Sequence, residues 1–283
     1  MSRYGKIGFI GAGNMGEAII GALIRSEVFS PADICITDLS RQRADMMQKE
    51  YQVTVMADNA SLFSACQMIM LAVKPQQMTD VLTDISTRSG YGVSERKLLI
   101  SIAAGFRMEK IENILYAPLD EAARKNLPVV RVMPNTPALV LSGISGMCGN
   151  RHAGPEDMAA ARTVLAAMGD VIAFEEEALL DAVTGVSGSG PAYVFYLIEA
   201  MTLGGIRAGL PEDRAVQLTL TTVEGAARLM RLKGESAESL RKKVTSPGGT
   251  TEAAVKVLDD NHVRQHIADA VLAAVRRSEE LSR

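Results

Sequence analysis

Short apolar runs alternate with amphipathic, helix-length segments through the first part of the chain. The runs are three to six residues long and rich in β-branched side chains, as strands buried on both faces of a sheet are. They cover residues 6–10, 34–37, 53–55, 68–73, 98–102, 129–133 and 171–174. Segments 14–25, 41–50 and 156–168 carry apolar residues at helical spacing. This alternation predicts a parallel sheet covered by helices on both faces.

After residue 175 the pattern becomes helical, with no convincing strand. Residues 179–183, 192–208, 214–232, 251–258 and 263–281 have helical period. Segment 192–208 is apolar nearly all round, so it is predicted to be buried on every side, one face being covered by a partner subunit. The chain is therefore predicted to be an α/β protein. A Rossmann-like doubly wound domain covers 1–175, and an all-α dimerisation and substrate domain covers 176–283.

Composition narrows the function classes. The chain has 283 residues, of which 47% are hydrophobic and 22% charged, enough for two well-buried domains. The net charge is −3, aromatic residues make up 4% and there is no Trp, which disfavours nucleic-acid binding. No apolar run approaches the roughly 20 residues of a membrane span. The first strand begins by Lys6, which leaves no room for a signal peptide, so we expect no membrane partner and a cytoplasmic location.

The cysteines and histidines do not indicate a metal centre. The three cysteines are widely spaced, form no CxxC pair and lie in apolar stretches, so they are expected to be buried free thiols. His262 and His266 have a spacing that could chelate, but the carboxylate-rich helix surface around them favours solvated side chains. We therefore predict no metal. The cysteines are Cys35, Cys66 and Cys148.

A glycine fingerprint follows the first predicted strand and opens the first predicted helix. Gly11 is expected to make the tight turn, Gly13 to let the backbone approach a pyrophosphate, and Gly16 to allow close packing of helix on strand. In this context the motif predicts dinucleotide binding. The predicted contacts in the turn are Gly11, Ala12, Gly13, Asn14, Met15 and Gly16.

The end of the second strand leaves the choice of dinucleotide open. Asp38 lies about twenty residues past the glycines, where an acid accepts hydrogen bonds from the adenosine ribose 2′-OH and favours NAD. Ser40, Arg41 and Arg43 follow, and a guanidinium there can pair with a 2′-phosphate, which favours NADP. Alternatively, both arginines are ordinary solvated residues of a first helical turn.

Further cofactor contacts are predicted at the ends of later strands. Lys74 is expected to reach ribose or phosphate, and Pro75 either turns the chain there or only starts a helix. Small residues within the stretch 100–105 would let a flat nicotinamide approach the backbone. Asn59, at a predicted helix start, is either a cap or a neighbour of the adenosine ribose. The predicted contacts are Asn59, Ala72, Val73, Lys74, Pro75, Ile102, Ala103 and Ala104.

Two segments of the helical domain, 186–193 and 246–251, are rich in glycine and hydroxyl residues at predicted helix starts. Free N–H groups and the positive end of a helix dipole suit a small carboxylate, although Ser246 and Pro247 could simply cap and begin a helix. Neither segment offers a strong acid or base. With a nicotinamide cofactor, hydride transfer to an already basic C=N bond therefore fits better than reduction of a ketone.

Six stretches in the same order make the chain resemble the pyrroline-5-carboxylate reductase family over essentially its whole length. They are 7–16, 72–75, 101–105, 133–137, 186–193 and the family's signature segment 246–251. The resemblance implies NAD(P)H-dependent reduction of the cyclic imino acid 1-pyrroline-5-carboxylate to L-proline, the last step of proline biosynthesis. NADP(H) is favoured and NAD(H) is the alternative, because the family often has a small neutral or hydroxyl residue at the position of Asp38.

The same resemblance implies a substrate site and an assembly. The substrate carboxylate would bind backbone N–H groups around 249–251, and catalytic Thr251 would hydrogen-bond the ring nitrogen and help deliver its proton. The family forms dimers with interlocked helical domains, so a homodimer or a higher homo-oligomer such as a decamer is expected. The implied substrate-binding residues are Ser187, Ser189, Ser246, Gly248, Gly249, Thr250 and Thr251.

Two other functions compete with this one. The 3-hydroxyacid dehydrogenases of the 6-phosphogluconate type share the two-domain plan, but they use a catalytic Lys on the first long helix of the second domain, and 187–208 contains no Lys. A non-catalytic nucleotide-binding protein, such as a redox sensor, is the second alternative. The intact turn at 246–251 argues against it, because a sensor has no need of a substrate anchor.

Overall fold

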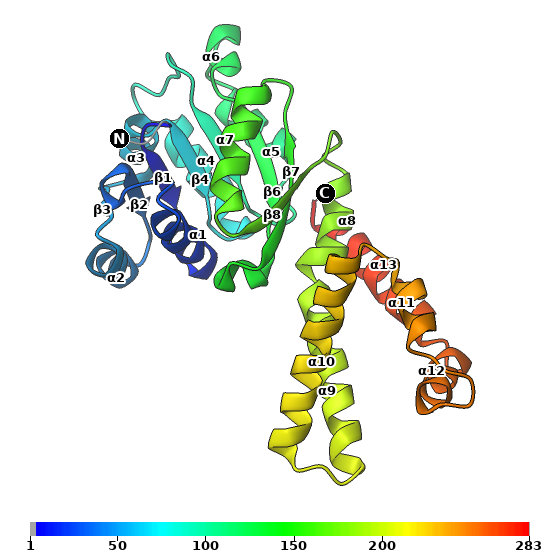
Figure 1. The fold of residues 1–283 in the computed structure, drawn as a ribbon. Helices are drawn as coiled ribbons and strands as arrows, with labels where there is room; N and C mark the ends of the chain where they lie inside the picture. The colour runs from blue at the N-terminus through cyan, green and yellow to red at the C-terminus, as the bar shows by residue number, and fades with distance from the viewer. Residues whose placement is uncertain (1–3, 283) are drawn as a thin grey trace. The chain divides into compact units, whose positions relative to one another are not determined.

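The computed structural model describes residues 4–282, which form two compact units (Figure 1). The first unit contains the chain up to Gly188 and again from Ala274 onward. The second unit is Ser189–Ala273. Each unit is described separately below.

The first unit is built on an eight-stranded sheet with the order β3-β2-β1-β4-β5-β6-β7-β8. The order reverses direction between β1 and β4, which creates the crevice where doubly wound folds bind ligands. The strands are β1 Ile7–Ile10, β2 Ile34–Thr37, β3 Thr54–Val55, β4 Met68–Leu71, β5 Leu98–Ser101, β6 Val129–Met133, β7 Gly143–Gly149 and β8 Gly169–Ala173. The predicted doubly wound architecture is confirmed.

One strand departs from the predicted pattern. Strand β7 was not expected from the sequence, and it pairs antiparallel with β6. Its sequence, GISGMCG, holds three glycines and no β-branched run, so it lacks the apolar signal of the other strands. All other neighbouring strands in the sheet are parallel. The expectation of a wholly parallel sheet is therefore wrong at this pair.

Helices cover both faces of the sheet and bury one apolar cluster on each. One cluster includes Phe9, Ile19 and Val164, and the other includes Leu62, Leu82 and Ile111. The helices and short turns are α1 Asn14–Arg25, η1 Pro31–Asp33, α2 Arg41–Tyr51, α3 Asn59–Ala65, η2 Pro75–Gln77, α4 Met78–Ser86, α5 Met108–Leu115, α6 Glu121–Lys125, η3 Thr136–Val140, α7 Pro155–Ala166, α8 Leu179–Val183 and η4 Thr184–Gly188. All three cysteines are free and buried, as predicted.

The second unit is entirely helical over its described residues. It contains α9 Gly190–Arg207, α10 Glu212–Lys233, α11 Ala237–Lys243, α12 Thr250–Asp260 and the first part of α13 Val263–Ser282. Helix α11 was not predicted, because its seven residues are mostly charged or small. None of the described helices is both long and apolar enough to cross a lipid bilayer.

Helix α9 is not buried on every side, which corrects the prediction for the chain alone. It has no buried residue, and Phe195 and Tyr196 are 60% and 75% exposed. An apolar surface of this kind on a monomer marks an interaction site. The residues predicted to be covered by a partner are therefore available for one.

Candidate active site

The turn between β1 and α1 is shaped by its glycines. Gly11 has φ +93°, and a Cβ there would lie 2.8 Å from the Ala72 carbonyl oxygen. A Cβ on Gly16 would lie 2.8 Å from the Gly11 carbonyl oxygen. Gly13 differs, since nothing lies within 4 Å of its Cβ position, and it begins α1 without a side-chain cap. The turn therefore packs tightly against the sheet and leaves its first helical N–H groups open to a ligand.

Beside this turn lies a cavity of about 430 Å³ at the carboxyl ends of β1, β2 and β4. Seven of the predicted cofactor residues line it, namely Gly11, Gly13, Asp38, Asn59, Ala72, Val73 and Lys74. The cavity also has walls that sequence reasoning did not single out: Ile10, Thr37, Leu39, Val55, Met56, Ala57, Asp58, Gln77, Val81 and Asp84. The rule that ligands bind at strand carboxyl ends could have pointed to Met56 and its neighbours, which follow β3 directly.

Asp38 ties the glycine turn to the start of α2. Its Oδ2 accepts a hydrogen bond of 2.9 Å from the backbone N–H of Ala12, and its Oδ1 accepts one of 2.8 Å from Ser40. Ala12 is fully buried, so its N–H depends on this carboxylate for a partner. Ser40 caps α2 through a side-chain bond from the Arg43 N–H. The acid therefore holds the backbone on both sides of the cavity.

The two arginines differ in their surroundings. Arg43 donates from Nε to the Ala12 carbonyl at 2.6 Å and forms an ion pair with Glu17, so its guanidinium is bound to the first turn of α1. Arg41 has a side chain that is 94% exposed and lies 3.9 Å from Asp45. Of the two, Arg41 has the freer guanidinium for a phosphate.

Asn59 does not cap its helix, so that alternative is wrong. Asp58 caps α3 instead, accepting from the Ser61 N–H at 2.7 Å, and hydrogen bonds from Ser61 lower the pKa of Asp58. The Asn59 Oδ1 accepts from the Thr37 hydroxyl at 2.7 Å. The Asn59 side chain is thereby fixed to the end of β2, at the wall of the cavity.

The remaining predicted cofactor residues lie outside this cavity. Pro75 begins the short turn η2, with Lys74 at its N-cap position. The loop after β5 carries Ala103, which is buried, and Ala104, which is exposed. Because β5 lies next to β4 with Leu71 opposite Ser101, this loop leaves the sheet at the same carboxyl edge as the cavity. The residues of the cofactor prediction that do not line the cavity are Ala12, Asn14, Met15, Gly16, Ser40, Arg41, Arg43, Pro75, Ile102, Ala103 and Ala104.

The signature turn at 246–251 belongs to the second unit. Helix α12 begins at Thr250 with Gly249 as N-cap, so Ser246 and Pro247 do not cap or begin it, and that alternative is wrong. Gly248 has φ +71° and donates its N–H to the Glu252 carboxylate at 2.8 Å. Within the described part of the chain, no side chain caps the Gly249 end of α12. The first N–H groups of the helix are therefore open to an acceptor.

The two serines near the boundary between the units are placed differently. Ser187 lies in the π-helical turn η4 and donates its hydroxyl to the Val183 carbonyl at 3.0 Å. Ser189 stands at the N-cap position of α9 without a side-chain cap bond. A π-helical turn inside a helix is frequently found at functional sites.

Two family models match this chain. Residues 177–281 match the one described as pyrroline-5-carboxylate reductase dimerisation, and residues 6–105 match the one described as NADP oxidoreductase coenzyme F420-dependent. Together they cover the glycine turn and cavity in one unit and the signature turn in the other.

Relatives match over nearly the whole length. The pyrroline-5-carboxylate reductase of Synechocystis sp. is 41% identical over 98% of each chain, and that of Escherichia coli is 35% identical over 98% of each chain. The structure of the Coxiella burnetii reductase has a TM-score of 0.86 at 36% identity, covering 99% of this chain and 100% of that one. The Plasmodium falciparum enzyme, solved with NADP bound, has a TM-score of 0.85 at 28% identity, with 100% of both chains covered.

Proposed function

The chain belongs to the pyrroline-5-carboxylate reductase family, and from this membership we propose that it reduces 1-pyrroline-5-carboxylate to L-proline, the last step of proline biosynthesis. The observation that carries the proposal is similarity over both units at once, at 41% identity and 98% coverage. The uncapped starts of α1 and α12 support it, because each would offer an anion-binding site to one of the two ligands.

The residues around the cavity fit a nicotinamide dinucleotide. Bound NADPH would supply the hydride that turns the C=N bond of the substrate into CH–NH. The N–H groups at 13–16 would hold the pyrophosphate, because those of Gly11 and Ala12 already donate to Thr37 and Asp38. Asp38 and Asn59 would face the adenosine ribose. Arg41 would pair with a 2′-phosphate, and Arg43 would keep the turn in place through the Ala12 carbonyl. We therefore propose NADPH as the preferred cofactor and NADH as the alternative.

The residues at the neighbouring edge would form the nicotinamide side of the site. Ala72, Val73, Lys74 and Pro75 follow β4, and Ile102, Ala103 and Ala104 follow β5. The small side chains of the three alanines would let a planar ring approach the backbone. Lys74 would reach a ribose or phosphate from the wall of the cavity.

The open start of α12 would bind the imino acid. Its N–H groups at Thr250 and Thr251 would hold the substrate carboxylate. Gly248 and Gly249 would shape the turn, with Ser246 nearby, because the Gly249 N–H donates to the Ser246 carbonyl at 3.0 Å. The hydroxyl of Thr251 would donate to the ring nitrogen and help deliver the proton that accompanies the hydride. Ser187 and Ser189 would contribute hydroxyl groups to substrate binding.

We further propose the domain division and the assembly. A boundary at residue 175 would place the family's dimerisation region, which starts at 177, wholly in the second domain. It assigns α8 and the end of α13 to that domain by sequence, whereas both pack within the first compact unit. The exposed apolar surface of α9 would then be covered by a second copy, giving a homodimer and, with more copies, a higher oligomer such as a decamer. The three free thiols suit a reducing compartment such as the cytoplasm.

A direct spectrophotometric assay, with identification of the product, tests the function. Protein, NADPH and 1-pyrroline-5-carboxylate are mixed, loss of reduced-cofactor absorbance is followed, and proline is identified chromatographically. We expect stoichiometric proline with NADPH and slower formation with NADH. No cofactor oxidation with either dinucleotide would instead support a nucleotide-binding sensor.

Gly13→Ala tests whether the dinucleotide binds at the cavity beside the glycine turn. Gly13 has φ −64° and no atom within 4 Å of its Cβ position, so the variant should fold normally. The added methyl group would meet the pyrophosphate, and the Kd for NADPH is expected to rise at least roughly tenfold. Gly92→Ala is the matched control, because Gly92 also has nothing within 4 Å of its Cβ position. Equal affinity in both variants would move the dinucleotide away from this turn.

A further inference from the structure

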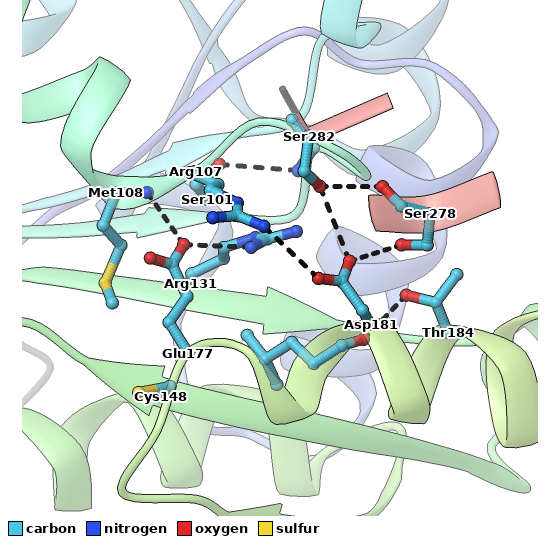
Figure 2. Close-up of polar contacts among 12 residues, drawn as sticks. Ser101, Arg107, Met108, Arg131, Cys148, Glu177, Asp181, Thr184, Ser278 and Ser282 are labelled. Atoms are coloured by element: carbon cyan, nitrogen blue, oxygen red, sulfur yellow. Dashed lines mark hydrogen bonds and ion pairs between the residues drawn. The ribbon is translucent and has the colours of Figure 1, made fainter. Parts of the chain in front are cut away.

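The first unit contains a buried carboxylate, Asp181, that the proposed chemistry does not use. Its side chain is 3% exposed and lies on α8. It accepts hydrogen bonds from the hydroxyl groups of Ser278 at 2.6 Å and Ser282 at 3.5 Å (Figure 2). These serines are one helical turn apart on α13, so both face the acid. Asp181 therefore fastens the last turn of α13 to α8.

The same carboxylate is paired with the loop that follows β5. Arg107 places a guanidinium nitrogen 3.8 Å from the Asp181 Oδ2 and stands at the N-cap position of α5. Two residues earlier, Gly105 has φ +71°, and its Cβ position lies 3.1 Å from Leu281 on α13. The end of the loop is thus held by an ion pair and by direct packing against the helix that Asp181 fastens.

A second acid holds the residue that follows. Glu177 Oε1 accepts from the Met108 N–H at 2.8 Å and from Arg131 at 2.9 Å (Figure 2). Arg131 is 3% exposed and lies on β6, inside the sheet. At its other end the loop is tied to β4, because the Ile102 N–H donates to the Leu71 carbonyl at 3.2 Å. The loop is therefore fixed at Ile102 by the sheet, at Arg107 by Asp181 and at Met108 by Glu177.

Residues 103 and 104 lie between these fixed points, and the proposed function puts the nicotinamide at 102–104. Burying a carboxylate is costly, and a buried ion pair is weak evidence for stability, but it can fix one geometry among several. Hydride transfer depends steeply on the alignment of donor and acceptor. The contacts of Asp181 act on the loop at Arg107 and on the end of α13, which packs on Gly105.

We propose that Asp181 is a positioning residue, which acts through Arg107 and the end of α13 to hold the loop at 102–107 against the nicotinamide ring. This inference rests on the proposed function. Asp181→Asn keeps an acceptor for Ser278 but removes the charge that pairs with Arg107. We expect kcat to fall about tenfold while the Kd for NADPH changes less than about threefold. The deuterium isotope effect with NADPH labelled at the transferred hydrogen should rise, because hydride transfer becomes slower relative to other steps.

Arg107→Gln removes the same ion pair from its partly exposed end and should fold even where Asp181→Asn does not. Glu280→Gln is the matched control. It also removes a carboxylate paired with an arginine on the last turns of α13, but its partner Arg277 and the acid itself are exposed. The control is expected to keep kcat and the isotope effect of the unmodified protein. A merely structural role of Asp181 would lower thermal stability and leave the isotope effect unchanged.

Fluorescence anisotropy of bound NADPH provides a measurement that needs no imine. A looser loop lets the nicotinamide move, so anisotropy at saturation should fall in Asp181→Asn and Arg107→Gln but not in Glu280→Gln. An unmodified protein that fails to reduce the imine would refute the proposed function, while the anisotropy still decides the role of Asp181. Unchanged anisotropy and isotope effect in both loop variants, or equal changes in the control, would overturn the inference.

Discussion

Replacing Asp38 by Asn tests the carboxylate that joins the two turns around the cavity. The acid accepts from the N–H groups of Ala12 and Ser40, whereas an amide has one oxygen and can serve only one of them. Because Ala12 is fully buried, the amide oxygen of the variant should face Ala12 and leave the exposed Ser40 N–H to water. Weakening one charged hydrogen bond and losing an exposed one costs about 1.5–2.5 kcal/mol of unfolding free energy.

Although it lowers stability, the same change should raise the preference for NADPH over NADH. Asp38 lines the cavity, where its negative charge opposes a 2′-phosphate and suits a ribose hydroxyl. Two like charges about 5 Å apart repel by about 1–2 kcal/mol at an effective dielectric between those of water and the protein interior. Asp38→Asn should therefore raise the ratio of kcat/KM for NADPH to kcat/KM for NADH by roughly tenfold.

Steady-state rates with both dinucleotides and urea unfolding of the same preparations measure the two effects separately. Asp120→Asn is the control, since Asp120 also accepts from a backbone N–H, that of Ala123 at 2.8 Å, but lies outside the cavity. It should lose stability without changing the cofactor ratio. A ratio that stays constant in Asp38→Asn would show that the charge does not reach the 2′ position, and the reasoning above would be refuted.

Two further predictions concern the substrate turn and the partly buried amine of Lys97. Thr251→Ala should lower kcat about ten- to a hundredfold with little change in the Kd for NADPH, because a hydrogen bond to a charged group contributes about 1.5–3 kcal/mol. Thr222→Ala is the control, since it removes a hydroxyl that is bonded within α10. Equal rates in both variants would remove Thr251 from the chemistry. Burial lowers the pKa of Lys97, so between that value and its ordinary 10.5 the unfolded chain binds more protons and folding stability rises with pH. Urea unfolding should therefore show the unmodified protein gaining stability relative to Lys97→Met as pH approaches 10.5, and parallel pH curves would contradict this.

The sequence was most informative where one local signal decides the structure. Strand β2 and helix α1 begin and end at the predicted residues, because each is a single apolar run or one amphipathic period bounded by glycine or polar residues. Strand β7 was missed because its glycines carry no such signal and its pairing with β6 supplies the structure instead. The apolar surface of α9 was recognised, but its exposure in the single chain was not.

Side-chain partners far apart in sequence could not be predicted in the same way. The fingerprint predicted that Asp38 faces the cavity, but nothing local shows that it accepts from Ala12, which is 26 residues earlier. Arg43 was assigned to the cofactor from its position, whereas its ion pair with Glu17 depends on how α1 and α2 pack. The bond between Asp181 and Ser278 spans 97 residues and requires the end of α13 to return to the first unit.

The contacts of Asp38 give a physical reason for an acid at this position. Both carboxylate oxygens face backbone N–H groups, so part of the charge is satisfied by the protein before any ligand binds. Asp38 accepts a hydrogen bond from the Ala12 N–H, and Arg43 donates one to the Ala12 carbonyl. Ala12 is therefore held through both of its backbone polar groups. A neutral residue at this position would favour a 2′-phosphate more strongly, but the glycine turn would lose the hydrogen bond between the Ala12 N–H and a carboxylate. Cofactor preference and rigidity of the turn are therefore linked through one side chain, and a variant that changes the first should also change the second.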